Sequence, residues 1–190
     1  MEMMLPPELT NERLRPLKRS EYERLTSLGY FEDERVELLF GMVVEMTPTD
    51  PAHSESTYQV RRSIEIAIGS RAKVVSQSPF AASDISEPEP DVFVVPAGKY
   101  WEEHPARSFL VVEVARSSLA RDRGMKARLY SSAQVDEYWI VNHVDNVVEV
   151  YRDAHEGTWR SKTTYQRGET ITMLAFPDVT VAVSEVLPPA

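Results

Sequence analysis

Short runs of apolar residues, separated by turn-forming residues, dominate the chain, and most of them have the length of a β-strand. Two runs, at residues 90–95 and 109–115, are nearly continuous, which is typical of strands covered on both faces. Alternation and length predict further strands at 36–39, 42–46, 73–78, 137–142, 147–152, 159–165, 170–173 and 179–183. The pattern therefore predicts a protein built around a β-sheet.

Three segments have the spacing of helices instead. A first helix is expected over residues 17–28. Ser20 and Glu23 have the spacing of a capping box, which favours a regular start at Ser20, and Gly29 suits the C-terminal end. Apolar residues recur with a helical period over 52–68, and a third helix is expected over 120–133. Strands and helices together predict a mixed α/β (α+β) fold.

The domain organisation is simple. Residues 1–16 are polar and proline-rich and are expected to form an N-terminal arm, and 17–190 are expected to form a single domain. A length of 190 residues suits one domain. There is no internal repeat or low-complexity stretch in the sequence.

Composition narrows the class of protein. The longest uncharged apolar stretch covers residues 38–44, far short of the roughly 20 residues that cross a bilayer. An acid at position 2 argues against a secretory signal, and the chain has no cysteine, so disulfides and thiolate metal sites are excluded. We therefore expect a cytoplasmic protein without a membrane association.

The net charge of −9 argues against a general nucleic-acid binder, because affinity for a phosphate backbone comes mostly from basic residues. A nuclease remains compatible with this charge, since metal-binding carboxylates add negative charge and basic residues can be local. With only 7 glycines there is no glycine-rich phosphate loop, so no nucleotide cofactor is expected.

Two acids stand where their surroundings least favour them. Asp91 opens one continuous apolar run and Glu113 interrupts the other, and a carboxylate in such a position is costly unless it is paired or binds a metal. If the two runs pair antiparallel, Asp91 can lie opposite Glu113, and a divalent cation would relieve their repulsion. The alternative is that each acid pairs with an arginine or lies at a frayed strand end.

The segment that follows Glu113 is locally basic. Asp122, Lys126 and Tyr130 share one face of the expected helix, and Met125 and Leu129 belong to a neighbouring stripe that suits the core. Five basic residues and one acid lie between positions 116 and 128. Beside a carboxylate metal site such a segment can hold a phosphate; otherwise it is an ordinary solvated helix face.

In their order and spacing, these segments resemble the Uma family of restriction-endonuclease-like proteins, within the PD-(D/E)XK nuclease superfamily. The resemblance runs from about residue 17 to 187 and is carried by Glu37-Leu38-Leu39-Phe40-Gly41, Met46-Thr47-Pro48, His53, Glu89-Pro90-Asp91-Val92, Leu110-Val111-Val112-Glu113-Val114, the segment 122–130 and Glu137-Tyr138-Trp139-Ile140-Val141. It implies a restriction-endonuclease-like mixed β-sheet flanked by helices, with additional C-terminal β-strands.

The resemblance also implies a set of site residues. Pro90-Asp91 matches the first half of the superfamily motif, but Ala115 stands where its lysine would be, which makes Lys126 the candidate lysine. Asp91, Glu113 and Lys126 are the implied catalytic residues. The implied ligands of Mg²⁺ or Mn²⁺ are Asp91, Glu113, Glu37 and the backbone carbonyl of Val114.

Other polar residues receive little weight. Gln77 precedes the first acidic strand and could lie nearby, whereas His53 and His104 each stand near a proline loop and are not assigned a catalytic role. Tyr138 and Trp139 alternate with strand neighbours in a way that favours core packing over base stacking.

The function implied is metal-dependent hydrolysis of DNA phosphodiester bonds, with a homodimer expected by resemblance to restriction enzymes. A second hypothesis is an inactive or weakly active nuclease fold that binds nucleic acid or a protein as a regulator. A third is a metal-bound structural protein with no basic surface near its acids.

Overall fold

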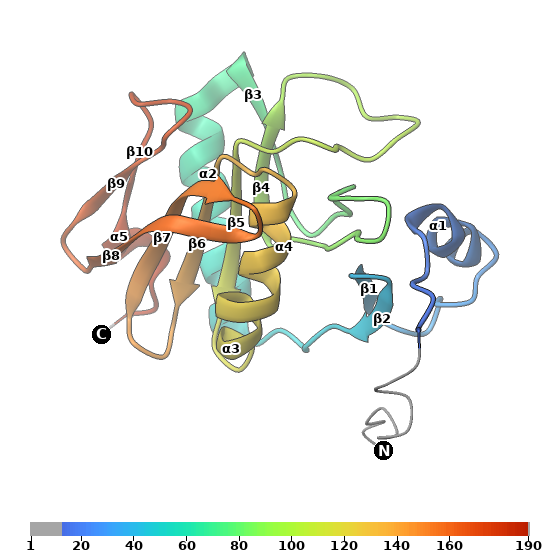
Figure 1. The fold of residues 1–190 in the computed structure, drawn as a ribbon. Helices are drawn as coiled ribbons and strands as arrows, with labels where there is room; N and C mark the ends of the chain where they lie inside the picture. The colour runs from blue at the N-terminus through green and yellow to red at the C-terminus, as the bar shows by residue number, and fades with distance from the viewer. Residues whose placement is uncertain (1–12, 190) are drawn as a thin grey trace.

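The structure is a computed structural model, and it describes residues 13–189. Its centre is a six-stranded mixed sheet in the order β3-β4-β5-β6-β7-β8 (Figure 1). The strands are β3 (Ala72–Val75), β4 (Val92–Pro96), β5 (Leu110–Ala115), β6 (Glu137–Asn142), β7 (Val147–His155) and β8 (Thr158–Gln166). The mixed sheet expected from the sequence is confirmed.

One pair of neighbouring strands is parallel and the others are antiparallel. β5 and β6 run parallel, while β3-β4, β4-β5, β6-β7 and β7-β8 are antiparallel. A parallel pair needs a crossover connection, and here that crossover is helical: α3 (Leu119–Arg121), the π-helix η3 (Asp122–Lys126) and α4 (Ala127–Ser132).

Helices cover both faces of the sheet. The long helix α2 (Pro51–Ile68), which is followed by the short 3₁₀ turn η2 (Gly69–Arg71), packs on one face through Val60, Ile64 and Ile68. The crossover helices cover the other face, with Leu129 and Tyr130 in that core (Figure 1). Both β4 and β5 are buried along their central residues, as their continuous apolar sequence predicts.

A hairpin beside the sheet carries one of the predicted acids. β1 (Val36–Leu39) and β2 (Met42–Glu45) pair antiparallel, joined by Phe40 and Gly41, which have φ values of 51° and 78°. Two consecutive positive φ values are what a two-residue hairpin turn requires. Backbone hydrogen bonds between Leu38 and Glu87 hold the hairpin to the loop before β4, and α1 (Arg19–Ser27) packs on it through Tyr22.

The C-terminal part forms a second small sheet. β9 (Thr170–Thr172) and β10 (Thr180–Ala182) pair antiparallel, and α5 (Val183–Val186) follows them. Their apolar residues join the core on the α2 side of the main sheet. The additional C-terminal strands expected from the sequence are therefore present.

Two local predictions were wrong. The first helix begins at Arg19, and it is Glu21, not Glu23, whose carboxylate accepts the N-cap hydrogen bond, from the Lys18 backbone N–H at 2.9 Å. Met125 is 37% exposed instead of lying in the core, because the π-helical turn at 122–126 alters the angular spacing on which the α-helical stripe was based. Tyr138 and Trp139 are buried, as predicted.

Of the expected N-terminal arm, residues 1–12 lie outside the described part of the chain. Among the described residues, no helix combines the length and apolar character needed to span a bilayer.

Candidate active site

Asp91 lies directly before β4, and Glu113 lies in the neighbouring antiparallel strand β5. Val92 lies opposite Val112 in the register of β4 and β5, so the same register, extended by one residue, sets Asp91 level with Glu113. One Asp91 oxygen, Oδ2, accepts a hydrogen bond of 2.8 Å from the backbone N–H of Val114. This bond fixes the carboxylate of Asp91 at the end of β5.

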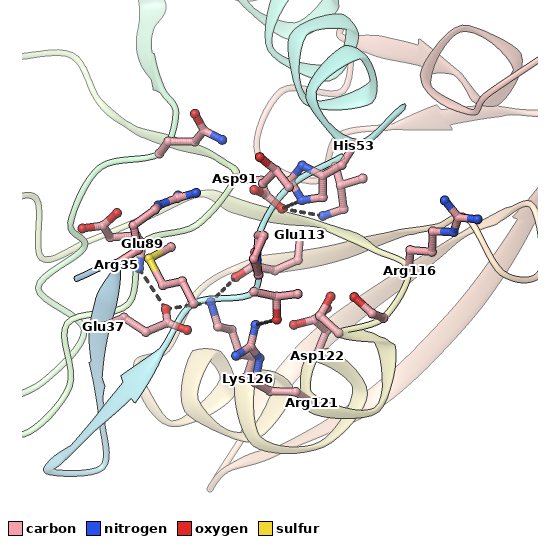
Figure 2. Close-up of a pocket in the computed structure, with 18 of the residues that line it drawn as sticks. Arg35, Glu37, His53, Glu89, Asp91, Glu113, Arg116, Arg121, Asp122 and Lys126 are labelled. Carbon is pink, nitrogen blue, oxygen red and sulfur yellow. Dashed lines mark hydrogen bonds and ion pairs between the residues drawn. The ribbon is translucent and has the colours of Figure 1, made fainter. Parts of the chain in front are cut away.

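Lys126 reaches the same point from the crossover helix. Its Nζ lies 2.8 Å from Glu37 Oε2 and 3.0 Å from Glu113 Oε1, and the residue is only 3% exposed. Figure 2 shows the lysine entering between the two glutamates. Lys126 therefore contacts two of the three acids named from the sequence, Glu37 and Glu113.

Tyr130 and Asp122 complete this face of the crossover. The Tyr130 hydroxyl donates to Glu113 Oε1 at 2.6 Å, so Lys126 and Tyr130 share one oxygen of Glu113. Asp122 is buried and accepts a hydrogen bond of 2.6 Å from the Ser118 hydroxyl. All three residues of the predicted helix face thus point toward the site.

Glu37 arrives from the β1–β2 hairpin and is almost fully buried, at 1% exposure. Its Oε2 accepts from Lys126 and from the backbone N–H of Glu89, at 3.2 Å. Its second oxygen, Oε1, is buried with no hydrogen-bond partner among the described residues. A buried carboxylate oxygen without a donor is costly, so this atom calls for a water molecule or a cation.

One pocket of about 60 Å³ is lined by Glu37, Asp91, Glu113, Asp122 and Lys126, and Arg35, Arg116 and Arg121 lie around it (Figure 2). The buried part of the pocket contains three carboxylates, those of Glu37, Glu113 and Asp122, and a single ammonium group, that of Lys126. The pocket therefore combines an acidic floor with arginines in its walls.

The pKa shifts follow from this crowding of carboxylates. Burial, followed by the neighbouring carboxylates of Asp91, Asp122 and Glu37, raises the pKa of Glu113 to about 8 even though Lys126 lowers it. Burial likewise raises the pKa of Asp122. Burial alone would lower the pKa of Lys126, but Glu113 and Glu37 outweigh it, so the pKa of the lysine is raised and the ammonium stays charged.

His53 belongs to the site although sequence reasoning set it aside. It lies in the first turn of α2, where the Asp50 carboxylate caps its backbone N–H at 2.9 Å, and its Nε2 is 3.1 Å from Asp91 Oδ2. Its Nδ1 is buried with no partner among the described residues. Burial lowers the pKa of His53, but the Asp91 carboxylate outweighs this and the pKa is raised. The cap residue before the helix was the available sequence signal.

The remaining candidates divide into those at the pocket and one elsewhere. Gln77, with a φ of 47°, and Val114 line the pocket. His104 is exposed in the loop between β4 and β5 and does not line it.

The donor set suits a hard divalent cation. Mg²⁺ and Mn²⁺ prefer carboxylate and carbonyl oxygens, and the site offers Asp91, Glu113 and Glu37, whose Oε1 lacks a donor. Within residues 13–189, however, no three histidine or acidic side chains are close enough to hold a metal as they stand. The residues therefore fit such an ion by their chemistry, and binding would require the side chains to adjust.

The comparisons with known proteins agree with the fold. The family model Uma2, described as "Putative restriction endonuclease", matches residues 19–184. No curated protein sequence matches the chain. The fold is similar to a crystal structure from Anabaena variabilis ATCC 29413, described as "a putative nuclease belonging to DUF820", with a TM-score of 0.72 over 90% of this chain and 97% of the other, at 12% identity. The chain therefore belongs to the Uma2 family.

Proposed function

We propose that this protein is an endonuclease that hydrolyses phosphodiester bonds in DNA with the help of Mg²⁺ or Mn²⁺. One observation carries the proposal: Asp91, Glu113, Glu37 and Lys126 come from four separate segments of the chain and line the same pocket. Two of these acids, Glu37 and Glu113, contact the lysine directly. The family match and the nuclease-type fold support the same reaction class.

Each residue has a role that follows from its contacts. Asp91, held by the Val114 N–H, and the free oxygens of Glu113 and Glu37 would supply metal ligands, together with the backbone carbonyl of Val114. When bound, a divalent metal polarises the scissile phosphate and lowers the pKa of a bound water. Lys126 keeps its charge between the two glutamates, so it would orient that water and offset charge on the phosphate.

The test compares plasmid nicking in Mg²⁺, Mn²⁺ and EDTA for the wild type and for Asp91→Asn, Glu113→Gln and Lys126→Met. Asp178→Asn is the matched control, since Asp178 is an exposed acid that pairs with Arg71 outside the pocket. We expect metal-dependent nicking that the three site variants lose and the control keeps. A wild type that neither nicks DNA nor binds Mn²⁺ in calorimetry would refute the proposal.

A second candidate function has one observation in its favour. Lys126 already bridges Glu37 and Glu113, so the site can be neutralised in part without any metal, as a structural ion-pair cluster would be. A nuclease fold that binds nucleic acid or protein without cleaving would keep these contacts. DNA binding without nicking, unaffected by Mn²⁺, would favour this alternative.

We further propose that the protein acts as a homodimer, because cutting both strands of a duplex calls for two sites. Analytical ultracentrifugation in the presence and absence of DNA tests this. A species that stays monomeric on a cleavable duplex would contradict it.

A further inference from the structure

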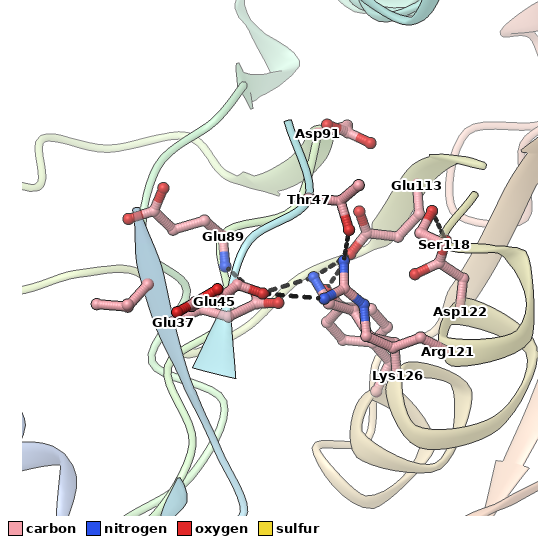
Figure 3. Close-up of polar contacts among 12 residues, drawn as sticks. Glu37, Glu45, Thr47, Glu89, Asp91, Glu113, Ser118, Arg121, Asp122 and Lys126 are labelled. Carbon is pink, nitrogen blue, oxygen red and sulfur yellow. Dashed lines mark hydrogen bonds and ion pairs between the residues drawn. The ribbon is translucent and has the colours of Figure 1, made fainter. Parts of the chain in front are cut away.

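Arg121 stands at the pocket with an unusual set of partners. Its guanidinium donates to the backbone carbonyl of Glu45 at 3.3 Å and to the Thr47 hydroxyl at 3.2 Å (Figure 3). Both distances are at the long end for such bonds, and both partners are uncharged. Its Nε is buried without a hydrogen-bond partner among the described residues. The guanidinium of Arg121 therefore donates long hydrogen bonds to uncharged acceptors.

Three other lysine and arginine side chains line the pocket: two are paired, and the third, Arg35, is exposed and forms no ion pair within residues 13–189. Lys126 is locked between two buried glutamates. Arg116 contacts the Asp50 carboxylate at 3.1 Å, and its side chain is 68% exposed. Arg121, by contrast, forms no ion pair with a carboxylate of residues 13–189, although it lines the same pocket as Asp91 and Glu113.

We propose that Arg121 binds a phosphate of the DNA backbone at the mouth of this pocket, exchanging Glu45 and Thr47 for two non-bridging phosphate oxygens. The proposal rests on the function proposed above and assigns the substrate-binding cation of that site. A planar guanidinium can hold a phosphate through two parallel hydrogen bonds. Because two long bonds to uncharged acceptors are given up for bonds to anionic oxygens, the exchange favours the phosphate.

The position of Arg121 also answers an electrostatic need. The acidic floor of Glu37, Glu113 and Asp91 would repel a phosphate diester that approaches it. Lys126 is only 3% exposed, so it acts on a phosphate only once that phosphate has reached the floor of the pocket. The Arg121 side chain extends from α3 toward the Glu45–Thr47 segment (Figure 3), and we place the incoming phosphate on its guanidinium, beside the acids.

The experiment measures binding of a fluorescently labelled DNA duplex with Ca²⁺ in place of Mg²⁺, at several salt concentrations, with a gel to confirm that the probe stays intact. The variants are Arg121→Gln and Arg121→Lys. Arg160→Gln is the charge-matched control, since Arg160 is exposed on the edge strand β8 and outside the pocket. Thr47→Val removes the hydroxyl that Arg121 contacts and keeps the shape of the side chain.

We expect Arg121→Gln to weaken binding roughly 10- to 100-fold and to reduce the slope of log affinity against log salt by about 1. Arg121→Lys should restore the slope but not the full affinity, because it keeps the charge and loses the fork. Arg160→Gln should change neither, and Thr47→Val should bind at least as tightly as the wild type. Melting temperatures check that every variant is folded.

Two results overturn the inference in different ways. If the wild type binds and cleaves DNA while Arg121→Gln matches Arg160→Gln, Arg121 does not contact phosphate and the nuclease function stands. If Thr47→Val weakens binding as much as Arg121→Gln, Arg121 acts only by holding the loop. A wild type that neither binds nor cleaves DNA removes the inference together with the proposed function.

Discussion

Replacing Lys126 by methionine should destabilise the protein strongly, and more so at high pH. Methionine keeps much of the apolar stem of lysine and removes the ammonium that lies 2.8 Å from Glu37 and 3.0 Å from Glu113. Removing one partner of a buried ion pair costs about 3–5 kcal/mol, because the other charge is left uncompensated. Here two carboxylates lose their cation, so we expect a loss in that range near pH 8.

The pH dependence follows from Glu113. Its pKa is about 8 in the folded protein, whereas a glutamate in the unfolded chain keeps its ordinary pKa of 4.5, so the folded state binds more protons between those limits. The free energy of unfolding therefore falls as the pH rises through this window, by at most about 1.4 kcal/mol per pH unit for one proton. Lys126 lowers the pKa of Glu113, so without it the window extends upward. At pH 5.5, where Glu113 is already protonated, Lys126→Met should cost less.

Urea denaturation of the wild type and of Lys126→Met at pH 5.5, 7 and 8 measures this difference in the free energy of unfolding. Lys162→Met is the matched control. Lys162 Nζ lies 2.7 Å from the buried carboxylate of Glu149, but its side chain is 43% exposed and Glu149 keeps its hydrogen bond from Arg123. We expect the control to lose about 1 kcal/mol or less. If Lys126→Met costs no more than the control at pH 8, or the same at every pH, the assignment of Lys126 as the neutralising charge is refuted.

Three further predictions concern Glu113, Tyr130 and His53, which belong to the same site. Tyr130→Phe removes the hydroxyl that donates to Glu113 at 2.6 Å and should lower the free energy of unfolding by about 1–3 kcal/mol, measured by urea denaturation; an unchanged value would contradict it. Glu113→Gln should reduce the pH dependence of stability between pH 4.5 and 8, because it removes one of the carboxyl groups whose pKa burial raises, while Glu87 and Asp122 remain; a wild-type slope in thermal melts over that range would refute this. His53→Ala should weaken Mn²⁺ binding about 10- to 100-fold in calorimetry, because His53 contacts Asp91 at 3.1 Å and outer partners of metal ligands have effects of that size; wild-type affinity would exclude this supporting role.

The acidic half of the site could be predicted because it depends on local patterns. Two almost continuous apolar runs indicate adjacent buried strands. An acid in each run stands out because burying a carboxylate without a partner costs free energy. The observed register, with Val92 opposite Val112, brings Asp91 and Glu113 to the same level, as an antiparallel pair allows. The helix face of Lys126 and Tyr130 was likewise visible as a spacing of four residues.

The rest of the site depends on contacts between distant segments, and no periodicity reports those. His53 meets Asp91 only because α2 begins beside the start of β4 and the end of β5, and Arg121 meets Thr47 only because the hairpin folds against the crossover helix. The π-helix over Asp122–Lys126 also escaped prediction, because the same sequence fits an α-helix. As a result Met125, which was expected in the core, is exposed.

The position of the lysine explains how three separate elements come together at one point. In the superfamily motif the lysine lies two residues after the acid. Here the acid is Glu113 and the lysine position holds Ala115, which is fully buried in the core beneath the crossover helix. A lysine at this position would have to enter packed apolar surroundings. From the crossover helix, Lys126 instead reaches Glu113 on the sheet and Glu37 on the hairpin at once. Its charge thereby offsets the repulsion between acids that the two elements would otherwise bring together without compensation.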